Sequence, residues 1–259
     1  MTNNSNKLMS GPYASYLTTI SILNLQFLLS TQFTDQNTLD WEVNLRTDLQ
    51  KSTFKTLVDP IVERLTKAPF FLLKEIWLSS ISSAIINFTS TTEHYIKDAL
   101  VLSLQRNSSL RKQAFSEISI SGSELENNFS LDTIKLKYFK VIATDKSKGE
   151  LFSAKFERAS KFLGVDRSFL DKKICTMLDS IWMLRNDIAH SNKGFKKLYE
   201  LEGKTGKFQI SKEPSKEEYF DFSIKLLEIM NDFTEYLKDW DAYILEKWPA
   251  NSFINSTNL

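Results

Sequence analysis

Residues 169–190 read FLDKKICTMLDSIWMLRNDIAH, and this stretch decides the fold. Its apolar residues recur at spacings of three and four, the period of one helix face. They are Ile174, Met177, Leu178, Ile181, Leu184 and Ile188. We predict an amphipathic helix over about 169–189, capped by Asp166-Arg167-Ser168 and ending at 191–194, where Gly194 suits a C-terminal cap. Such a helix must bury its apolar stripe against other helices, which favours a bundle.

Composition supports an all-α fold. Gly and Pro number only 7 and 5 among 259 residues, and 42% of the chain is hydrophobic, enough for a sizeable core. Further helices are expected at 54–66, 70–104, 109–118, 132–142, 151–163 and 215–248, with a turn at 203–206 and a short strand at 207–211. We therefore predict an antiparallel helical bundle over residues 53–250 and a tail at 251–259.

The N-terminal region is ambiguous. Residues 1–10 are polar and expected to fray. Trp41, Val43 and Leu45 alternate with polar residues as in a strand, whereas Trp41, Leu45 and Leu49 are spaced for a helix. We interpret residues 1–52 as a small N-terminal attachment, with a β-hairpin as the expected form.

Several classes of protein are excluded. The single cysteine, Cys175, cannot form an internal disulfide and suits a reducing cytosol, so we expect a cytoplasmic protein. Residues 17–30 are too short and too polar for a membrane span, and lack the basic region and cleavage site of an export signal. Two histidines and one cysteine cannot build a typical zinc site, and Gly203-Lys204-Thr205 lacks the first glycine of a phosphate-binding loop. We expect no metal and no cofactor.

The net charge of +1 conceals an uneven distribution. Basic residues predominate over 135–173, and Lys193, Lys196 and Lys197 follow shortly afterwards, whereas the ends of the chain are acidic. Such clustering is typical of a nucleic-acid-binding surface, and the alternative is a solvated helix face. We predict that Lys193, Lys196 and Lys197 bind RNA.

The end of the 169–190 helix carries the candidate chemistry, Arg185-Asn186-Asp187-Ile188-Ala189-His190. Asn186 and His190 lie on one line, whereas Arg185 and His190 are about 140° apart, so the long Arg185 side chain must swing to meet the others. Cleavage of RNA by its own 2′-hydroxyl needs a base, an acid and a cation on the phosphate. One helix supplies one histidine, so we predict a homodimer whose two helices build a composite site. Trp182 shares the polar face and could stack on a base, although a core position is the alternative.

This hexapeptide resembles the R-x4-6-H signature of HEPN domains, and its RN-x-x-AH form is similar to the RiboL-PSP-type and MAE-type branches. Glu93-His94-Tyr95-Ile96-Lys97 resembles a second segment of those branches. The resemblance covers roughly residues 53–194. Two positions depart from the pattern: Ser191 follows the histidine where glycine is frequent, and Asn192 stands where toxins modified by a nucleotidyltransferase usually have tyrosine.

The resemblance implies a dimeric all-α bundle and metal-independent endoribonuclease activity, as in toxins, phage-defence effectors and RNA-processing enzymes. Arg185 would bind the phosphate, His190 would transfer protons, and Asn186 and Asp187 would orient or assist them. Glu93 would be a buried helper of Arg185, and a purely structural role is the alternative. The alternative is a noncatalytic HEPN scaffold that docks a partner such as an ATPase or sensor. In either case a regulatory partner protein from the same operon is expected.

Overall fold

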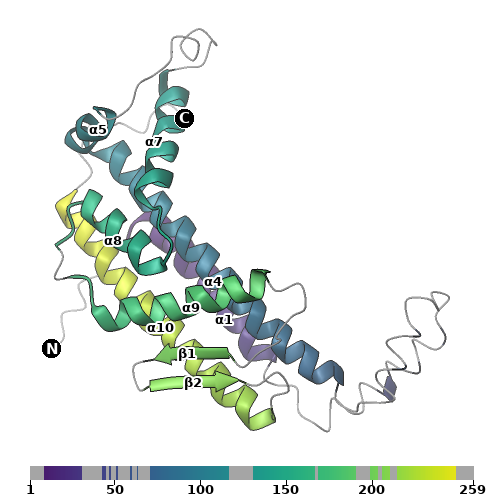
Figure 1. Ribbon diagram of the computed structural model, residues 1–259. Coiled ribbons are helices and arrows are strands. Elements are labelled where there is room, and N and C mark those ends of the chain that lie inside the picture. Colours follow the sequence, from purple (N-terminus) through teal and green to yellow (C-terminus); the bar gives the residue numbers. More distant parts are fainter. Residues whose placement is uncertain are drawn as a thin grey trace, which may run out of the picture.

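A computed structural model gives the fold (Figure 1). The structure describes residues 9–30, 71–116, 131–166, 169–190, 199–203, 206–210 and 215–248, together with isolated positions 43, 44, 47, 51, 59 and 63. The helices are α1 (Gly11–Ser30), α4 (Phe71–Arg106), α5 (Ser108–Phe115), α7 (Leu131–Lys146), α8 (Phe152–Phe162), α9 (Lys172–His190) and α10 (Lys216–Lys247). The strands are β1 (Tyr199–Gly203) and β2 (Gly206–Ile210). The predicted all-α fold class is confirmed.

The two longest helices, α4 and α10, run in the same direction. Three aromatic pairs join them in increasing order along both helices: Trp77–Tyr219, Phe88–Phe233 and Tyr95–Trp240, with ring centroids 4.8, 6.0 and 5.8 Å apart. The bundle is therefore not antiparallel throughout, because the connection between α4 and α10 is long enough to return the chain to its starting end. Stacked and edge-to-face rings bury much apolar area in fixed geometry, so these pairs set the register of the two helices.

Helix α1 completes this layer and runs opposite to α4 and α10 (Figure 1). Tyr13, Tyr16 and Ile20 are buried in the same core as the rest of the bundle. The β-hairpin expected in the N-terminal region is therefore wrong for residues 16–30, and α1 is a member of the bundle rather than an attachment to it. The isolated polar residues that interrupt the apolar run, such as Thr18 and Ser21, bond back to the carbonyls of Ala14 and Leu17 and so remain compatible with a helix.

The alternating pattern at 41–46 and the helix expected at 54–66 lie outside the described residues, apart from isolated positions. The other predicted helices are present, with ends that differ by a few residues. Among the helices that the structure describes, none combines the length and hydropathy of a bilayer-spanning segment.

Helix α9 crosses in front of α4 and begins later than predicted (Figure 1). The side chain of Asp171 caps it, with Oδ1 accepting bonds from the backbone N–H groups of Lys173 and Ile174 at 2.7 and 3.2 Å. Asp166 instead closes a turn, since its carbonyl accepts a bond from the N–H of Phe169. Asp171 is therefore the N-cap in place of the predicted Asp166-Arg167-Ser168 cluster. It supplies the same kind of side chain closer to the apolar stripe.

A two-stranded antiparallel hairpin follows α9. β1 and β2 pair from Tyr199–Ile210 to Gly203–Gly206, as the predicted turn and short strand require. Gly206 has a positive φ of 128°, a conformation that L side chains rarely adopt. Ile210 is fully buried, so β2 delivers the chain to the core immediately before α10.

A buried carboxylate ties the start of α1 to the end of α10. Asp241 is 2% exposed. It accepts bonds from the backbone N–H and the hydroxyl of Ser10, at 2.9 and 2.5 Å, and from the Tyr95 hydroxyl at 3.1 Å. Nearby, burial raises the pKa of Tyr16 to about 12, and burial together with Asp241 raises the pKa of Tyr95 well above its ordinary value. These hydroxyls therefore remain protonated at physiological pH.

Replacing Asp241 should destabilise the fold strongly. Asp241→Ala leaves three buried donors without an acceptor, and we expect a loss of about 2–4 kcal/mol in the free energy of unfolding. Urea denaturation followed by circular dichroism measures it. Asp221→Ala, an exposed carboxylate on the same helix, is the matched control and should change stability by less than about 0.5 kcal/mol. Equal effects of the two variants would show that the Asp241 bonds contribute nothing net.

Candidate functional site

Arg185 lies in the last two turns of α9 and is half-buried. One guanidinium nitrogen, Nη1, donates to Oδ1 of Asn186 at 3.0 Å, so the neighbouring amide holds the fork in place. The buried Nε has no hydrogen-bond partner among the described residues, and no described carboxylate forms an ion pair with Arg185. A cation that is oriented, and that no described carboxylate neutralises, is suited to hold an anion.

Trp182 lies one turn before Arg185 and is 6% exposed. The Arg185 guanidinium carbon lies 5.2 Å from its ring centroid, and the Lys155 ammonium of α8 lies 3.8 Å from it. The indole N–H donates to the carbonyl of Glu150 at 3.1 Å, and the ring packs on Phe152. So little of the ring is accessible that the predicted stacking of Trp182 on an RNA base is not supported. Trp182 instead packs in the core and positions Arg185.

Glu93 of α4 forms an ion pair with Lys155. Support of Arg185 or a purely structural role was predicted for it, and no described bond joins Glu93 to Arg185. Glu93 instead contacts Lys155, and both Lys155 and Arg185 contact the Trp182 ring. Both charged side chains are largely buried, with 23% of Glu93 and 14% of Lys155 exposed, so solvent screens this pair less than a surface pair.

Lys155 was missed by sequence reasoning. The sequence of α8 nevertheless indicates that Lys155 lies close to the core. Lys155 immediately precedes Phe156 and follows Phe152 by three positions. Both phenylalanines are buried, so a lysine between them must lie at the edge of the buried face. Only the packing of three helices reveals which partner it meets there.

Asp179 fixes the start of α8 against the middle of α9. Its carboxylate accepts bonds from the backbone N–H and the hydroxyl of Ser153, at 2.8 and 2.6 Å. The first turn of a helix has unpaired N–H groups and a partial positive charge, both of which a carboxylate satisfies. Because Lys155 is only two residues beyond Ser153, this contact also determines where Lys155 lies.

The remaining predicted residues are placed as follows. Asn186 is half-buried and Asp187 is exposed. His190 is the last residue of α9, and its side chain lies outside what the structure describes, as do Lys193, Lys196 and Lys197. The structure therefore brings together Arg185, Asn186 and Trp182 and connects them to Glu93, whereas the position of the imidazole remains a prediction. Within the described ranges, no group of three His, Cys, Asp or Glu residues is placed to hold a metal ion.

We expect Glu93 and Lys155 to be energetically coupled. A double-mutant cycle with Glu93→Gln and Lys155→Met should give a coupling of about 1–2 kcal/mol in the free energy of unfolding, because the pair is largely buried. Denaturant titration measures each variant. The matched control is the pair Glu235 and Lys238, which is more exposed and lies within one helix. Its coupling should not exceed about 0.5 kcal/mol, and a similar value for both pairs would contradict the special role of Lys155.

Comparison with known protein families gives a match. A sequence model described as RiboL-PSP-HEPN matches residues 74–239, more than half of the chain. The matched region begins in α4 and ends in α10, and so includes Glu93, Lys155, Trp182 and Arg185. No curated protein and no solved structure matches the chain.

Proposed function

The chain belongs to the RiboL-PSP-HEPN family, and on this premise we propose that it is a metal-independent endoribonuclease with a composite site in a homodimer. HEPN domains are often endoribonucleases, commonly dimerise and bind RNA, so membership indicates an RNA-related role. The observation that carries the proposal is Arg185, a half-buried cation without a described carboxylate partner, five residues before His190 on one helix.

The proposed reaction needs no group beyond side chains and the RNA itself. One His190 removes the proton from a 2′-hydroxyl, whose oxygen attacks the adjacent phosphorus. The bond from phosphorus to the 5′-oxygen breaks, and a second, protonated His190 gives its proton to that oxygen. The products are a 2′,3′-cyclic phosphate and a 5′-hydroxyl, and Arg185 stabilises the negative charge that develops on the phosphoryl oxygens.

The environment of α9 suits these roles. Asn186 orients the Arg185 guanidinium by the 3.0 Å bond from Nη1, so that the exposed part of the fork can meet phosphate oxygens. His190 ends the helix, where the partial negative charge of the terminal carbonyls favours the protonated imidazole needed in the acid. Asp187 is exposed on the last turns of α9 and can orient an imidazole from a second subunit.

The biological role that fits best is that of a toxin or phage-defence effector. An endoribonuclease without a metal requirement is active wherever RNA is present, so the cell must restrain it. We therefore propose a regulatory partner from the same operon. The alternative function is a noncatalytic HEPN scaffold, which would be favoured if the purified dimer binds partners but leaves RNA intact.

Cleavage in EDTA tests the proposal. The wild-type protein should cut a labelled single-stranded RNA in EDTA and leave 2′,3′-cyclic phosphate ends. His190→Ala should lower the rate roughly 100-fold or more, since general acid–base catalysis supplies that range. His94→Ala, which replaces the exposed histidine of α4, is the matched control and should cut as the wild type does. A folded wild-type dimer that leaves RNA uncut would contradict the nuclease function and favour the scaffold.

Hybrid dimers test whether the site is composite. Two tags allow isolation of a dimer with one wild-type subunit and one His190→Ala subunit. If each cleavage uses both histidines, this hybrid should be nearly as inactive as the fully substituted dimer. Independent sites would instead leave about half of the wild-type rate, and light scattering would detect a monomer.

A further inference from the structure

Lys155 of α8 contacts both the carboxylate of Glu93 and the ring of Trp182. Its ammonium lies 3.8 Å from the ring centroid, and the guanidinium carbon of Arg185 lies 5.2 Å from the same centroid. The two cationic groups are therefore no more than 9.0 Å apart, the sum of these distances. Because little of the Lys155 side chain meets solvent, its charge acts mainly on these neighbours.

Glu93 brings a partly buried negative charge close to Arg185. The carboxylate is bonded to Lys155, whose distance from the guanidinium is comparable with the Debye length of about 8 Å, and partly buried charges are screened less than exposed ones. The two acidic residues of the same helix are placed differently. Asp179 accepts two bonds from Ser153, and Asp187 lies about 200° around α9 from Arg185.

A carboxylate near Arg185 competes with an RNA phosphate for the same donors, because a guanidinium fork fits both groups. The ion pair with Lys155 cancels most of the charge of Glu93 and leaves Arg185 its own. Without Lys155, Glu93 would be a partly buried carboxylate without that partner, and such a group attracts another cation strongly. Arg185 is a cation that no described carboxylate neutralises, so it would become the partner of Glu93 in place of a phosphate.

We propose that Lys155 is a positioning residue that neutralises Glu93 and so keeps Arg185 available for the phosphate of the RNA. The inference rests on the proposed endoribonuclease function and adds to it a residue that acts through another. Lys155 contacts neither the phosphate nor the reacting atoms. Since it acts through the charge of Glu93, removal of that charge should make Lys155 unnecessary.

RNA binding tests this directly when every variant is placed in the His190→Ala background. Fluorescence anisotropy with a labelled single-stranded RNA measures Kd over a series of salt concentrations. Lys155→Met should raise Kd roughly tenfold and lower the slope of log K against log salt by about 0.7, since one phosphate contact is lost. Adding Glu93→Gln to Lys155→Met should return Kd to within about threefold of the parent, and Lys155→Arg alone should stay in that range.

A cycle with Arg185 shows through which residue Lys155 acts. Arg185→Ala should raise Kd at least as much as Lys155→Met does, and the two substitutions together should raise it no further than Arg185→Ala alone. Additive losses would overturn the proposal, because Lys155 would then contact the phosphate itself. A double variant of Glu93→Gln and Lys155→Met that binds no better than Lys155→Met would also overturn it, since the effect would then be one of packing.

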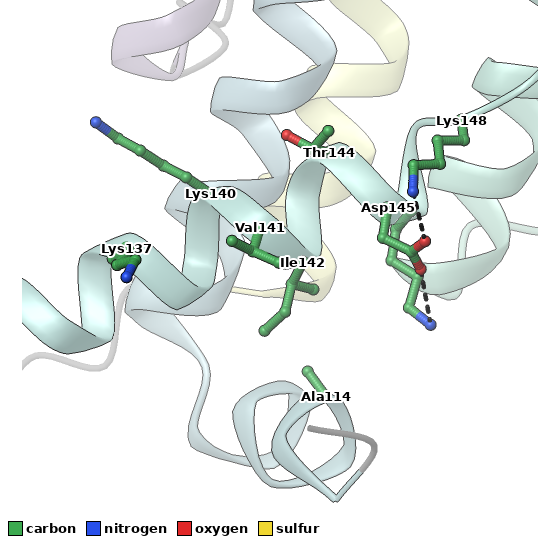
Figure 2. A pocket seen from close by; sticks show the side chains of 9 residues that line it. Ala114, Lys137, Lys140, Val141, Ile142, Thr144, Asp145 and Lys148 are labelled. Carbon is green, nitrogen blue, oxygen red and sulfur yellow. Dashed lines mark hydrogen bonds and ion pairs between the residues drawn. The ribbon is translucent and has the colours of Figure 1, made fainter. Parts of the chain in front are cut away.

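The matched control is Lys146→Met. Lys146 is also largely buried, lies 3.9 Å from the carboxylate of Asp145 and has the Phe162 ring 5.7 Å away. Asp145 keeps its ion pair with Lys148, drawn in Figure 2, and one with Arg158, so this substitution leaves no carboxylate without a cation. Kd should stay within about twofold of the parent, and an increase equal to that of Lys155→Met would refute the proposal.

Stability and cleavage separate the inference from a structural role and from the nuclease function. Circular dichroism at the assay temperature confirms that each variant is folded, and a purely structural Lys155 would change Tm but leave the Kd of the folded protein unaltered. With native His190, Lys155→Met should lower the cleavage rate and Glu93→Gln should restore it. Cleavage by the wild type with no effect of Lys155→Met would refute the inference and leave the nuclease intact. The expected binding pattern in a protein that never cuts RNA would refute the nuclease and support the role of Lys155.

Discussion

The position of Arg185 in the candidate site depends on its contact with the indole ring of Trp182. The Trp182 ring meets both Lys155 and Arg185, and its N–H bonds the turn before α8. Like charges would separate if the aromatic ring did not attract both, and the carboxylate of Glu93 offsets part of the repulsion. Three helices from distant parts of the chain thus define the position of one guanidinium. Asp179 contributes to the same arrangement from α9 by fixing the first turn of α8.

The larger frame holds these helices in register through aromatic rings. The pairs between α4 and α10 make the two helices parallel, and α1 fills the space beside them with Tyr13 and Tyr16. Against this rigid layer α9 crosses with its apolar stripe buried as far as Leu184. The same helix carries Arg185 at the edge of that stripe, where no described carboxylate neutralises it.

Much of this could be predicted from periodicity. The stripe of α9, the long apolar repeat of α4 and the turn between β1 and β2 are local patterns, and local patterns determine the type of an element. The direction of α10 relative to α4 could not be predicted, since it depends on which aromatic faces which across more than a hundred residues of chain. The same limit applies to Asp171 and Asp166, two acidic residues near one helix start whose backbone conformations decide which becomes the cap. The apolar run in α1 was ambiguous because its helix is stabilised by burial of tyrosines with polar ends.

The same limit applies to the candidate site: residues close in sequence could be predicted, whereas contacts between distant helices could not. Arg185, Asn186 and His190 were identified because they are close in sequence and chemically distinctive, whereas Lys155 was missed because lysine is common and its meaning comes from a partner on α4. Glu93 was singled out as a candidate, but its ion pair with Lys155 could not be predicted, since a spacing pattern cannot reveal which helix will lie between two others.

The bonds from Asp241 to Ser10 also impose an order in time. The two residues are 231 positions apart, so the core cannot close during translation until nearly the whole of α10 has left the ribosome. Before that moment α1 has no partner for Ser10, and α4 has no ring to place against Tyr95 other than those of α1. Contacts this distant in sequence form late because a large loop must close first. A polypeptide that is built this way acquires its mature core only after α10 has been translated.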